Sequence, residues 1–356
     1  MKIATIVGVR PQFVKASVVS RELRKEHDEI LIHTGQHYDY KMNEVFFEEL
    51  NIPVPDYFLE IGSGSHAYQT GEMLKKIEEV LIKEKPDLVL TYGDTNSTLA
   101  GALAASKLHI KTAHVESGLR SFDKTMPEEI NRILTDHCSD LLFCPTENAV
   151  HNLKNEGITD NVFLTGDVMA DSVIFNKAIA EKQSTILNDL NLESKKYLLA
   201  TVHRASNTDN PTNLQNIVDA FCELDDLVVF PVHPRTKKLL KEYNLYDKLA
   251  SSVKLIEPVG FLDFIKLMNN SKMILTDSGG IQKEAYILKI PCITLRENTE
   301  WMETVEDGWN VLVGADKRRI VKMVNELSPS LDTHNDRFGK GDASRKIAAV
   351  INTEGI

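Results

Sequence analysis

A Ser-Gly-Gly turn at residues 278–280 stands between an apolar run and a segment with helical character. Residues 273–275 predict a buried strand, and residues 282–288 predict a helix. Ser278 is a candidate N-cap, and the two glycines let a ligand approach the bare backbone. The helix N-terminus offers unpaired N–H groups to an anion, and Glu284 would accept hydrogen bonds from sugar hydroxyls beside a bound phosphate. An ordinary strand-to-helix turn is the alternative interpretation.

Polar and charged side chains also occupy the segments that follow the other predicted strands. They are Arg10, Lys15, Gln36, His37, Asp94, Glu116, Arg120, Glu128, His203, Arg204, His233, Arg235 and Ser278. In open parallel sheets, ligands bind at the carboxyl ends of the strands. The repeated placement therefore indicates one ligand site assembled from several loops.

Three of these side chains are carboxylates in the first half of the chain: Asp94, Glu116 and Glu128. Carboxylates that lie close together raise one another's proton affinity, which suits acid/base chemistry near neutral pH. Each also has a purely structural interpretation. Asp94 could serve as a helix N-cap, and Glu128 could only complement a helix dipole.

Several cations would supply positive potential for a diphosphate, together with the helix end at Ser278: Arg10, Lys15 and His203. The structural alternatives are again open. Lys15 could be a solvated helix residue, and His203 could simply hydrogen-bond the backbone after its strand.

Length and composition limit the class of protein. A chain of 356 residues with 42% hydrophobic and 26% charged residues predicts a globular, soluble protein of two domains. The net charge of −11 argues against general nucleic-acid binding, which needs a basic face. The first strand begins at Lys2, and no apolar run approaches the length of a membrane span. We therefore expect a cytoplasmic protein with no signal peptide, no membrane association and no nucleic-acid partner.

Neither the cysteines nor the histidines indicate a metal site. The four cysteines are far apart and lack metal-ligand spacing, so reduced core thiols are expected: Cys138, Cys144, Cys222 and Cys292. Residues 37–39, His-Tyr-Asp, lie near His33, but no carboxylate spacing supports a metal there.

Strand and helix signals alternate through the first half of the chain and restart after Gly166-Asp167. The predicted strands are residues 3–9, 29–34, 87–92, 111–115, 141–144, 162–165, 197–202, 227–232, 253–256, 273–276 and 292–295. The main predicted helices are residues 13–24, 43–50, 68–83, 97–106, 168–191, 213–223, 237–243, 261–269, 282–288, 316–327 and 343–351, with one more opening at 126–132. Such alternation is typical of parallel sheets. It predicts an α/β protein with two Rossmann-like, doubly wound domains facing across a cleft, residues 1–167 and 168–341.

Seven motifs, in the same order, resemble the non-hydrolysing UDP-N-acetylglucosamine 2-epimerases along nearly the whole chain. They are Gly8-Val9-Arg10-Pro11-Gln12-Phe13-Val14-Lys15, Thr34-Gly35-Gln36-His37-Tyr38, Gly93-Asp94-Thr95, His114-Val115-Glu116-Ser117-Gly118-Leu119-Arg120, Pro127-Glu128-Glu129-Ile130-Asn131-Arg132, His203-Arg204 and Asp277-Ser278-Gly279-Gly280-Ile281-Gln282-Lys283-Glu284. The resemblance implies a glycosyltransferase-B type fold, usually as a homodimer, with a final helix at 342–356 that rejoins the N-terminal domain. It implies no nicotinamide or other cofactor.

The resemblance also implies a reaction and residue roles. The family eliminates UDP to give a 2-acetamidoglycal and adds UDP back with the carbon-2 proton on the other face, which needs two acid/base groups and a preorganised diphosphate site. Asp94 and Glu116 would transfer protons, with Glu128 orienting them or sharing the role. The remaining implied contacts are His203 and Arg10 to the departing diphosphate, Lys15 in the reacting site, Ser278, Gly279 and Gly280 to phosphate, Glu284 to the ribose and Phe264 near the uracil.

Two motifs depart from the UDP-N-acetylglucosamine pattern. Residues 299–301 read Thr-Glu-Trp where Thr-Glu-Arg is usual, and residues 203–207 read His-Arg-Ala-Ser-Asn where His-Arg-Arg-Glu-Asn is usual. Four strings resemble instead the branch that acts on UDP-2,3-diacetamido-2,3-dideoxy-glucuronate: residues 10–13, 121–123, 166–169, and Trp301 with 308–310. A uronate would need an extra cation, for which Arg204, Arg235 and Arg296 are the candidates. A glycosyltransferase of the same fold and a non-catalytic nucleotide-sugar sensor are the competing classes, although neither explains the N-terminal carboxylates.

Overall fold

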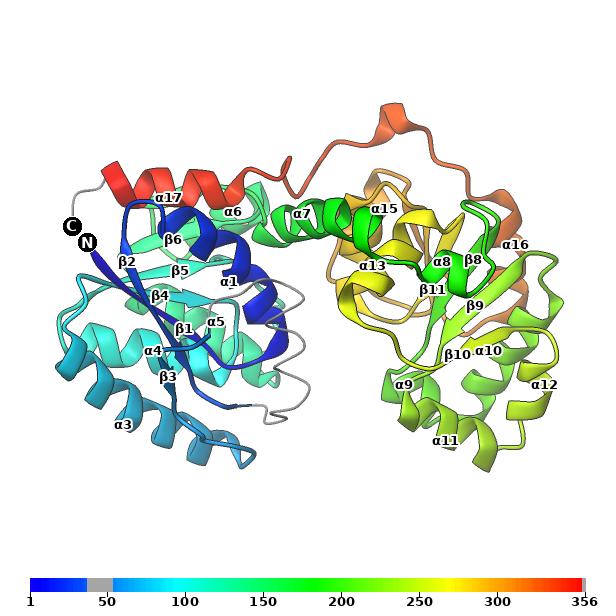
Figure 1. Ribbon diagram of the computed structural model, residues 1–356, viewed down its shortest axis with the longest axis horizontal. Helices are drawn as coiled ribbons and strands as arrows, with labels where there is room; N and C mark the ends of the chain where they lie inside the picture. Colours follow the sequence, from blue (N-terminus) through cyan, green and yellow to red (C-terminus); the bar gives the residue numbers. More distant parts are fainter. Residues whose placement is uncertain (37–53, 354–356) are drawn as a thin grey trace. The chain divides into compact units, whose positions relative to one another are not determined.

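The computed structural model describes residues 1–36 and 54–353. The chain divides into two compact units, unit 1 with Met1–Ser172 and Phe338–Ile356, and unit 2 with Val173–Arg337. Each unit contains one parallel sheet with helices packed against it, so the α/β class predicted from the sequence is confirmed (Figure 1). The predicted helix at 43–50 and His37 lie outside the described residues.

In the described part of unit 1, seven parallel strands follow the order β3-β2-β1-β4-β5-β6-β7. Their bounds are β1 Lys2–Val7, β2 Asp28–His33, β3 Tyr57–Phe58, β4 Leu88–Tyr92, β5 Lys111–Val115, β6 Leu141–Cys144 and β7 Val162–Leu164. The helices are α1 Arg10–Leu23, α3 His66–Glu84, α4 Asn96–Lys107, α5 Pro127–Cys138, α6 Glu147–Asn155 and α17 Ala343–Thr353, while α7 Val168–Gln183 begins in unit 1 and continues into unit 2. The strand order reverses between β1 and β4, which is the usual position of a ligand in such a sheet.

Within residues 173–337, six parallel strands repeat this arrangement in the order β10-β9-β8-β11-β12-β13. Their bounds are β8 Tyr197–Thr201, β9 Leu227–Pro231, β10 Lys254–Ile256, β11 Met273–Thr276, β12 Cys292–Thr294 and β13 Asn310–Leu312. The helices are α8 Ile186–Asp189, α9 Ala205–Thr208, α10 Pro211–Glu223, α11 Pro234–Glu242, α12 Tyr246–Ala250, α13 Phe261–Asn270, α14 Gly279–Ile287, α15 Met302–Glu306 and α16 Lys317–Glu326. Here the order reverses between β8 and β11.

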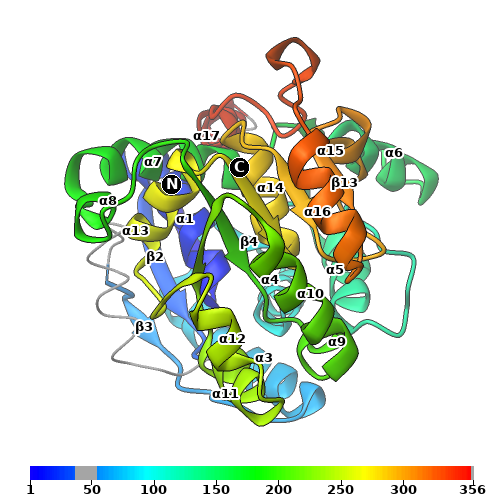
Figure 2. The same cartoon turned by 90° about the vertical axis from the view of Figure 1, so that its right-hand side faces the viewer.

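Each sheet is buried by apolar side chains. In unit 2, Leu198 and Ala200 of β8 and Leu275 of β11 pack in one cluster with residues of α10 and α16, which lie side by side on the same face (Figure 2). In unit 1, a second cluster joins β1 and β2 to α3 and α4. None of the described helices is both long and apolar enough to pass through a lipid bilayer.

The start of α1 corrects a sequence prediction. The strand expected at 3–9 ends at Val7, and the helix expected from Phe13 begins at Arg10. Two features cause this early start. Pro11 has the fixed φ of a first helical turn, and the Gln12 side chain accepts hydrogen bonds from the amides that precede the helix.

The helix predicted at 168–191 is also wrong as a single element, because it is interrupted between α7 and α8. The Ser184 hydroxyl donates to Asp263 Oδ1 over 2.5 Å and accepts from the Ile186 amide over 3.3 Å. A serine side chain that bonds to the backbone in this way competes with helix continuation.

The C-terminal helix α17 packs against α1, the two helices forming a layer of unit 1 (Figure 1). Ile347 and Ile351 are fully buried there. Asp171 of α7 holds the beginning of α17, since its carboxylate accepts from the amides of Ala343 and Ser344 over 3.0 and 2.8 Å. The last helix is therefore an integral part of unit 1.

Candidate active site

In unit 1, the loops after β1 and β4 are joined by the buried side chain of Gln12. Its Oε1 accepts from the Gly8 amide over 2.7 Å, and its Nε2 donates to the Tyr92 carbonyl over 2.6 Å. These two loops carry Arg10 and Asp94. Gln12 thus fixes both sides of the point at which the strand order reverses.

Lys15 and Glu116 form a buried ion pair at this point. Lys15 lies on α1 and Glu116 follows β5, each residue is 9% exposed, and Nζ contacts Oε2. Lys15 is therefore not a solvated helix residue, and that alternative is wrong. The backbone of Glu116 is left-handed, with φ of 75°, a strained conformation for a residue with a side chain.

Gly93 lies against this pair. A Cβ at residue 93 would be 3.3 Å from Glu116 Oε2 and 3.7 Å from Lys15 Nζ, and φ is 65°. Only a glycine fits this conformation without strain and without a side chain that presses on the two charged groups.

Asp94 follows directly and faces α5. Its Oδ2 accepts from Arg132 Nη2 over 2.6 Å, and its backbone oxygen accepts from Asn131 over 2.9 Å. The interpretation of Asp94 as a helix N-cap is wrong, because Thr95 is the N-cap of α4 and accepts from the Thr98 amide.

A second buried group supports Gly93 from β5. His114 Nε2 lies 2.7 Å from the Gly93 carbonyl oxygen, and Nδ1 lies 2.6 Å from Asp136 Oδ1. Asp136 also accepts from Arg120 over 2.7 Å. Burial alone would raise the pKa of Asp136, but the hydrogen bonds and charges of His114 and Arg120 lower it overall.

Two predicted residues of unit 1 are exposed. Arg10 is the first residue of α1, and Glu128 lies in the first turn of α5. Asp94 follows Gly93 in the chain, and Glu116 Oε2 would lie 3.3 Å from a Cβ at residue 93, whereas the Glu128 side chain makes no hydrogen bond or ion pair with another described residue. Across residues 1–36 and 54–353, no group of three His, Cys, Asp or Glu side chains is placed to hold a metal ion.

In unit 2, Asp277 organises the loops after β8 and β11. The carboxylate is completely buried and accepts from the amides of His203 and Arg204 over 3.1 and 3.0 Å. It also accepts from the Asn207 side chain over 3.1 Å. His203 Nδ1 lies 3.5 Å from Asp277 Oδ1 while half of its side chain stays exposed, so the imidazole is held at one nitrogen and presented to solvent.

The Ser-Gly-Gly turn begins α14 three residues earlier than predicted, at Gly279. Ser278 is the N-cap residue of α14, as predicted, although its hydroxyl makes no capping hydrogen bond. Among the described residues, the amides of Gly279, Gly280 and Ile281 have no hydrogen-bond acceptor. Together these groups provide donors and a positive helix end to an anion.

Residues 300 and 301 line the start of α14. A Cβ at Gly279 would lie 3.1 Å from Glu300 Oε2 and 3.7 Å from Trp301 Nε1. The Trp301 ring in turn covers the buried ammonium of Lys283, with 4.3 Å from Nζ to the ring centroid. Because glycine has no Cβ, the backbone at residue 279 can lie close to the side chains of Glu300 and Trp301. Glu284 and Phe264 are partly buried on α14 and α13.

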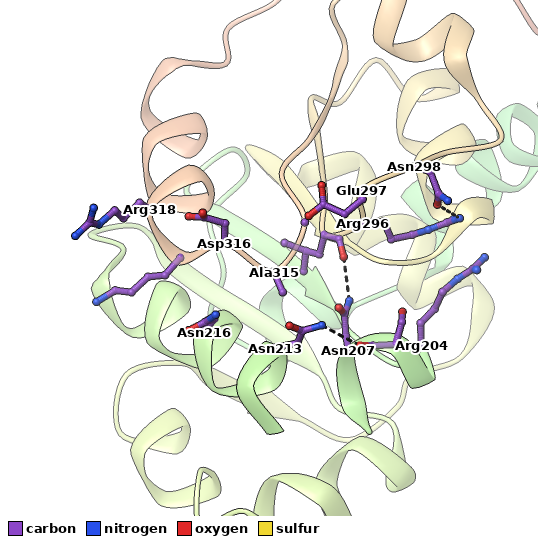
Figure 3. Close-up of a pocket in the computed structure, with 14 residues that line it drawn as sticks. Arg204, Asn207, Asn213, Asn216, Arg296, Glu297, Asn298, Ala315, Asp316 and Arg318 are labelled. Carbon is purple, nitrogen blue, oxygen red and sulfur yellow. Dashed lines mark hydrogen bonds between the residues drawn. The ribbon is translucent and has the colours of Figure 1, made fainter. Parts of the chain in front are cut away.

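Of the three candidate arginines, Arg204 and Arg296 contact Glu300. Arg296 donates to the two Glu300 oxygens over 2.9 and 3.0 Å, and Arg204 Nη2 lies 3.7 Å from Glu300 Oε1. Both arginines line a polar pocket of about 870 Å³ on the side of α9, α10 and α16, where Asn207 forms part of the wall (Figure 3). Arg235 instead donates to both oxygens of Asp209 over 2.6 Å.

The structure adds site residues that sequence reasoning did not single out: Gln12, Arg132 and Asp277. All three stand inside the motifs quoted above, so their presence was visible. Their roles depend on partners 80, 38 and 74 positions away in the chain, which neither periodicity nor spacing reveals.

A family model described as UDP-N-acetylglucosamine 2-epimerase matches residues 21–352. This chain belongs to that family. A UDP-N-acetylglucosamine 2-epimerase homolog of Methanococcus maripaludis is 62% identical over 354 residues, which cover 99% of both chains. A UDP-2,3-diacetamido-2,3-dideoxy-D-glucuronate 2-epimerase of Pseudomonas aeruginosa is 50% identical over 360 residues, again 99% of both.

A solved relative has the same fold. The UDP-GlcNAc 2-epimerase of Methanocaldococcus jannaschii, in complex with UDP-GlcNAc and UDP, superposes with a TM-score of 0.85 at 51% identity and covers 99% of both chains. The epimerase family and the glycosyltransferase-B-like fold predicted from the motifs are therefore confirmed. The protein is an isomerase that acts on UDP-sugars, and the transferase and sensor alternatives are set aside.

Proposed function

We propose that this epimerase inverts carbon 2 of UDP-2,3-diacetamido-2,3-dideoxy-glucuronate by eliminating UDP and adding it back through a glycal. The supporting observation is that Arg204 and Arg296 contact Glu300, which adjoins the Gly279 end of α14. The more exposed of the two, Arg204, gives this end of α14 a guanidinium group that suits a substrate with an additional carboxylate. The whole-length similarity to the Pseudomonas aeruginosa enzyme supports the same substrate.

UDP-N-acetylglucosamine is the second candidate substrate. The Methanococcus maripaludis and Methanocaldococcus jannaschii relatives carry that sugar in their names and share 62% and 51% identity with this chain. Neither sugar requires a different reaction, because the proton to be moved is on carbon 2 in both.

In the proposed reaction, Asp94, Glu116 and Glu128 of unit 1 serve proton transfer, with Arg10 and Lys15 beside them. Unit 2 holds UDP. The α14 amides and the positive end of the helix stabilise the charge of the leaving diphosphate, and His203 adds a hydrogen bond. Glu284 binds the ribose and Phe264 contacts the uracil. Residues 1–167 with 342–356 and residues 168–341 are the proposed functional domains.

Deuterium incorporation tests this function. The protein is incubated with each UDP-sugar in deuterated water, and the sugar is followed by NMR. The expected result is epimerisation with deuterium at carbon 2. Absence of exchange with both sugars, also in the presence of UDP-N-acetylglucosamine as an activator, would contradict it, and release of free UDP with N-acetylmannosamine would indicate a hydrolysing enzyme.

The arginine contacts predict how the two sugars are distinguished. The Arg296 side chain is 11% exposed and fully engaged with Glu300 and Asn298, whereas that of Arg204 is 41% exposed. We therefore expect Arg204→Met to lower kcat/KM about 10- to 100-fold more for the uronate than for UDP-N-acetylglucosamine, since a charge-assisted hydrogen bond contributes about 1.5–3 kcal/mol. Arg235→Met is the matched control, because Arg235 is paired with Asp209. An equal loss on both sugars would exclude this role for Arg204.

We also propose a cytoplasmic homodimer. All four cysteines are unpaired, as is usual in a reducing compartment. Exposed apolar side chains recur every four residues from the N-cap of α5 onward, at Met126, Ile130 and Leu134. Such a stripe is typical of a surface covered by a partner. Light scattering of the purified protein measures the assembly, and Ile130→Glu should shift a dimer toward monomer.

A further inference from the structure

Arg132 links Asp94 to the first turn of α5. Its Nη2 lies 2.6 Å from Asp94 Oδ2 and its Nη1 lies 2.9 Å from Glu129 Oε2. The Arg132 side chain is 17% exposed. Asn131 holds the Asp94 carbonyl from the same helix. Both the backbone and the carboxylate of Asp94 are thus fixed by α5.

The second carboxylate has a partner of different chemistry. Glu116 is paired with Lys15. Unlike a guanidinium group, the ammonium group of a buried lysine can lose its proton. A guanidinium group stays protonated in proteins. Asp94 therefore faces a permanent charge, whereas Glu116 faces a proton that can move.

We propose that Arg132 is a positioning residue that keeps Asp94 ionised and aimed, so that Asp94 takes the carbon-2 proton while the Lys15–Glu116 pair returns one. This inference rests on the proposed epimerase function. It assigns proton removal to Asp94 and proton return to the Lys15–Glu116 pair, two roles that the proposed function does not distinguish. The structural basis is the pair of Arg132 hydrogen bonds and the buried ion pair on the other side of Gly93.

Both steps of the proposed reaction conserve protons and electrons. In the first step the carbon-2 proton goes to an Asp94 oxygen, the carbon–hydrogen electrons form the C1=C2 bond, and the C1–O electrons leave with UDP. In the second step a UDP oxygen forms a bond to C1, and the C1=C2 electrons take a proton from the Lys15–Glu116 pair on the opposite face. Asp94 then releases its proton to solvent, and the pair regains one.

The charged groups around Asp94 favour this division. Among the described residues, α5 contributes Arg132 and Glu129, while α1 and the loop after β5 contribute Lys15 and Glu116. The two neighbouring imidazoles have other partners, because His66 contacts Asn96 and His114 contacts the Gly93 carbonyl. Burial alone would lower the pKa of Arg132, but Asp94 and Glu129 raise it overall. The arginine is therefore charged throughout the working pH range, and its Nη2 lies 2.6 Å from Asp94 Oδ2.

The test is the pH dependence of kcat for the full-length enzyme, with carbon-2 exchange as the assay. Arg132→Met should move the acidic limb of the pH–kcat profile to higher pH by about one unit or more. The reason is that loss of an opposite charge raises a carboxyl pKa by about 1–3 units. The loss of kcat should reach about 10-fold at pH 6 and should almost disappear at pH 9, since a carboxyl pKa raised from about 4 to about 7 leaves roughly a tenth of the groups ionised at pH 6. Arg132→Lys, which keeps the charge, should leave the limb in place. Arg24→Met, which removes an arginine bonded to Glu29 elsewhere in unit 1, is the matched control and should change neither limb.

Two outcomes would overturn the inference: an equal loss at every pH in Arg132→Met, or a limb displaced as far by Arg132→Lys as by Arg132→Met. Arg132→Gln provides a second neutral variant if the methionine variant does not fold. In an Asp94→Asn background, Arg132→Met should cause no further shift of the pH profile, because the group on which it acts is gone. Failure of the epimerase function itself looks different, since wild-type enzyme would then exchange no deuterium with either sugar.

Discussion

Glu116→Gln is expected to lower kcat by about 10³-fold and at the same time to destabilise unit 1. Loss of a proton-transfer group typically costs about 10²–10⁴ in rate. The substitution also leaves the Lys15 ammonium buried without its counter-charge, and breaking a buried ion pair costs about 3–5 kcal/mol of unfolding free energy. Urea denaturation and carbon-2 exchange measure the two effects separately.

The double variant Lys15→Met/Glu116→Gln separates stability from chemistry. Removing both charges should recover most of the lost unfolding free energy, because no unpaired charge remains, while activity stays low. Glu84→Gln removes one member of the more exposed Lys2–Glu84 pair and should leave both properties near the wild-type values. Full activity in the double variant would exclude the pair from proton transfer.

Asp277→Ala is expected to weaken UDP binding at least 10-fold and to lower the unfolding free energy by about 3–5 kcal/mol. The carboxylate is the acceptor for two backbone amides and the Asn207 side chain, and each buried donor left without an acceptor costs about 1–3 kcal/mol. His203 also loses the group that orients its ring. Calorimetric titration with UDP and urea denaturation measure these changes.

Two control variants show whether the effect of Asp277→Ala comes from its buried acceptor oxygens. Asp277→Asn retains one acceptor oxygen and should lose less stability and less UDP affinity than the alanine variant. Asp226→Ala removes a carboxylate that only pairs with Lys272 at the surface of the same unit, and it should leave UDP affinity unchanged. Normal UDP binding in a folded Asp277→Ala protein would show that the turn after β11 does not depend on this carboxylate.

Most strands of both sheets were predictable, because strands buried on both faces are short apolar runs such as residues 273–276 and 111–115. The edge strands β3 and β13 were missed. They contain two and three residues, and most of their side chains are only partly buried, so neither produces a clear apolar run. Edge strands depend on a neighbour for their hydrogen bonds, and that neighbour is not encoded locally.

The candidate site also contains residues that were predictable from the sequence and partners that were not. Motif order indicated Asp94, Glu116 and the Ser278 turn, because their residue types stand at strand ends. The partners that decide protonation and orientation could not be predicted, since Arg132 and Lys15 reach their carboxylates only after helices pack on the sheet. Ser278 shows the converse case, in which a local capping preference is not used.

The position of α17 has a consequence for biosynthesis. Unit 2 is one continuous segment, Val173–Arg337, whereas unit 1 needs residues from both ends of the chain. As the chain leaves the ribosome, unit 2 can complete its core first, while α1 waits for Ile347 and Ile351 to cover it. A nascent chain that stops before residue 343 should therefore expose an apolar surface on α1 to chaperones, even though every strand of both sheets has already been made.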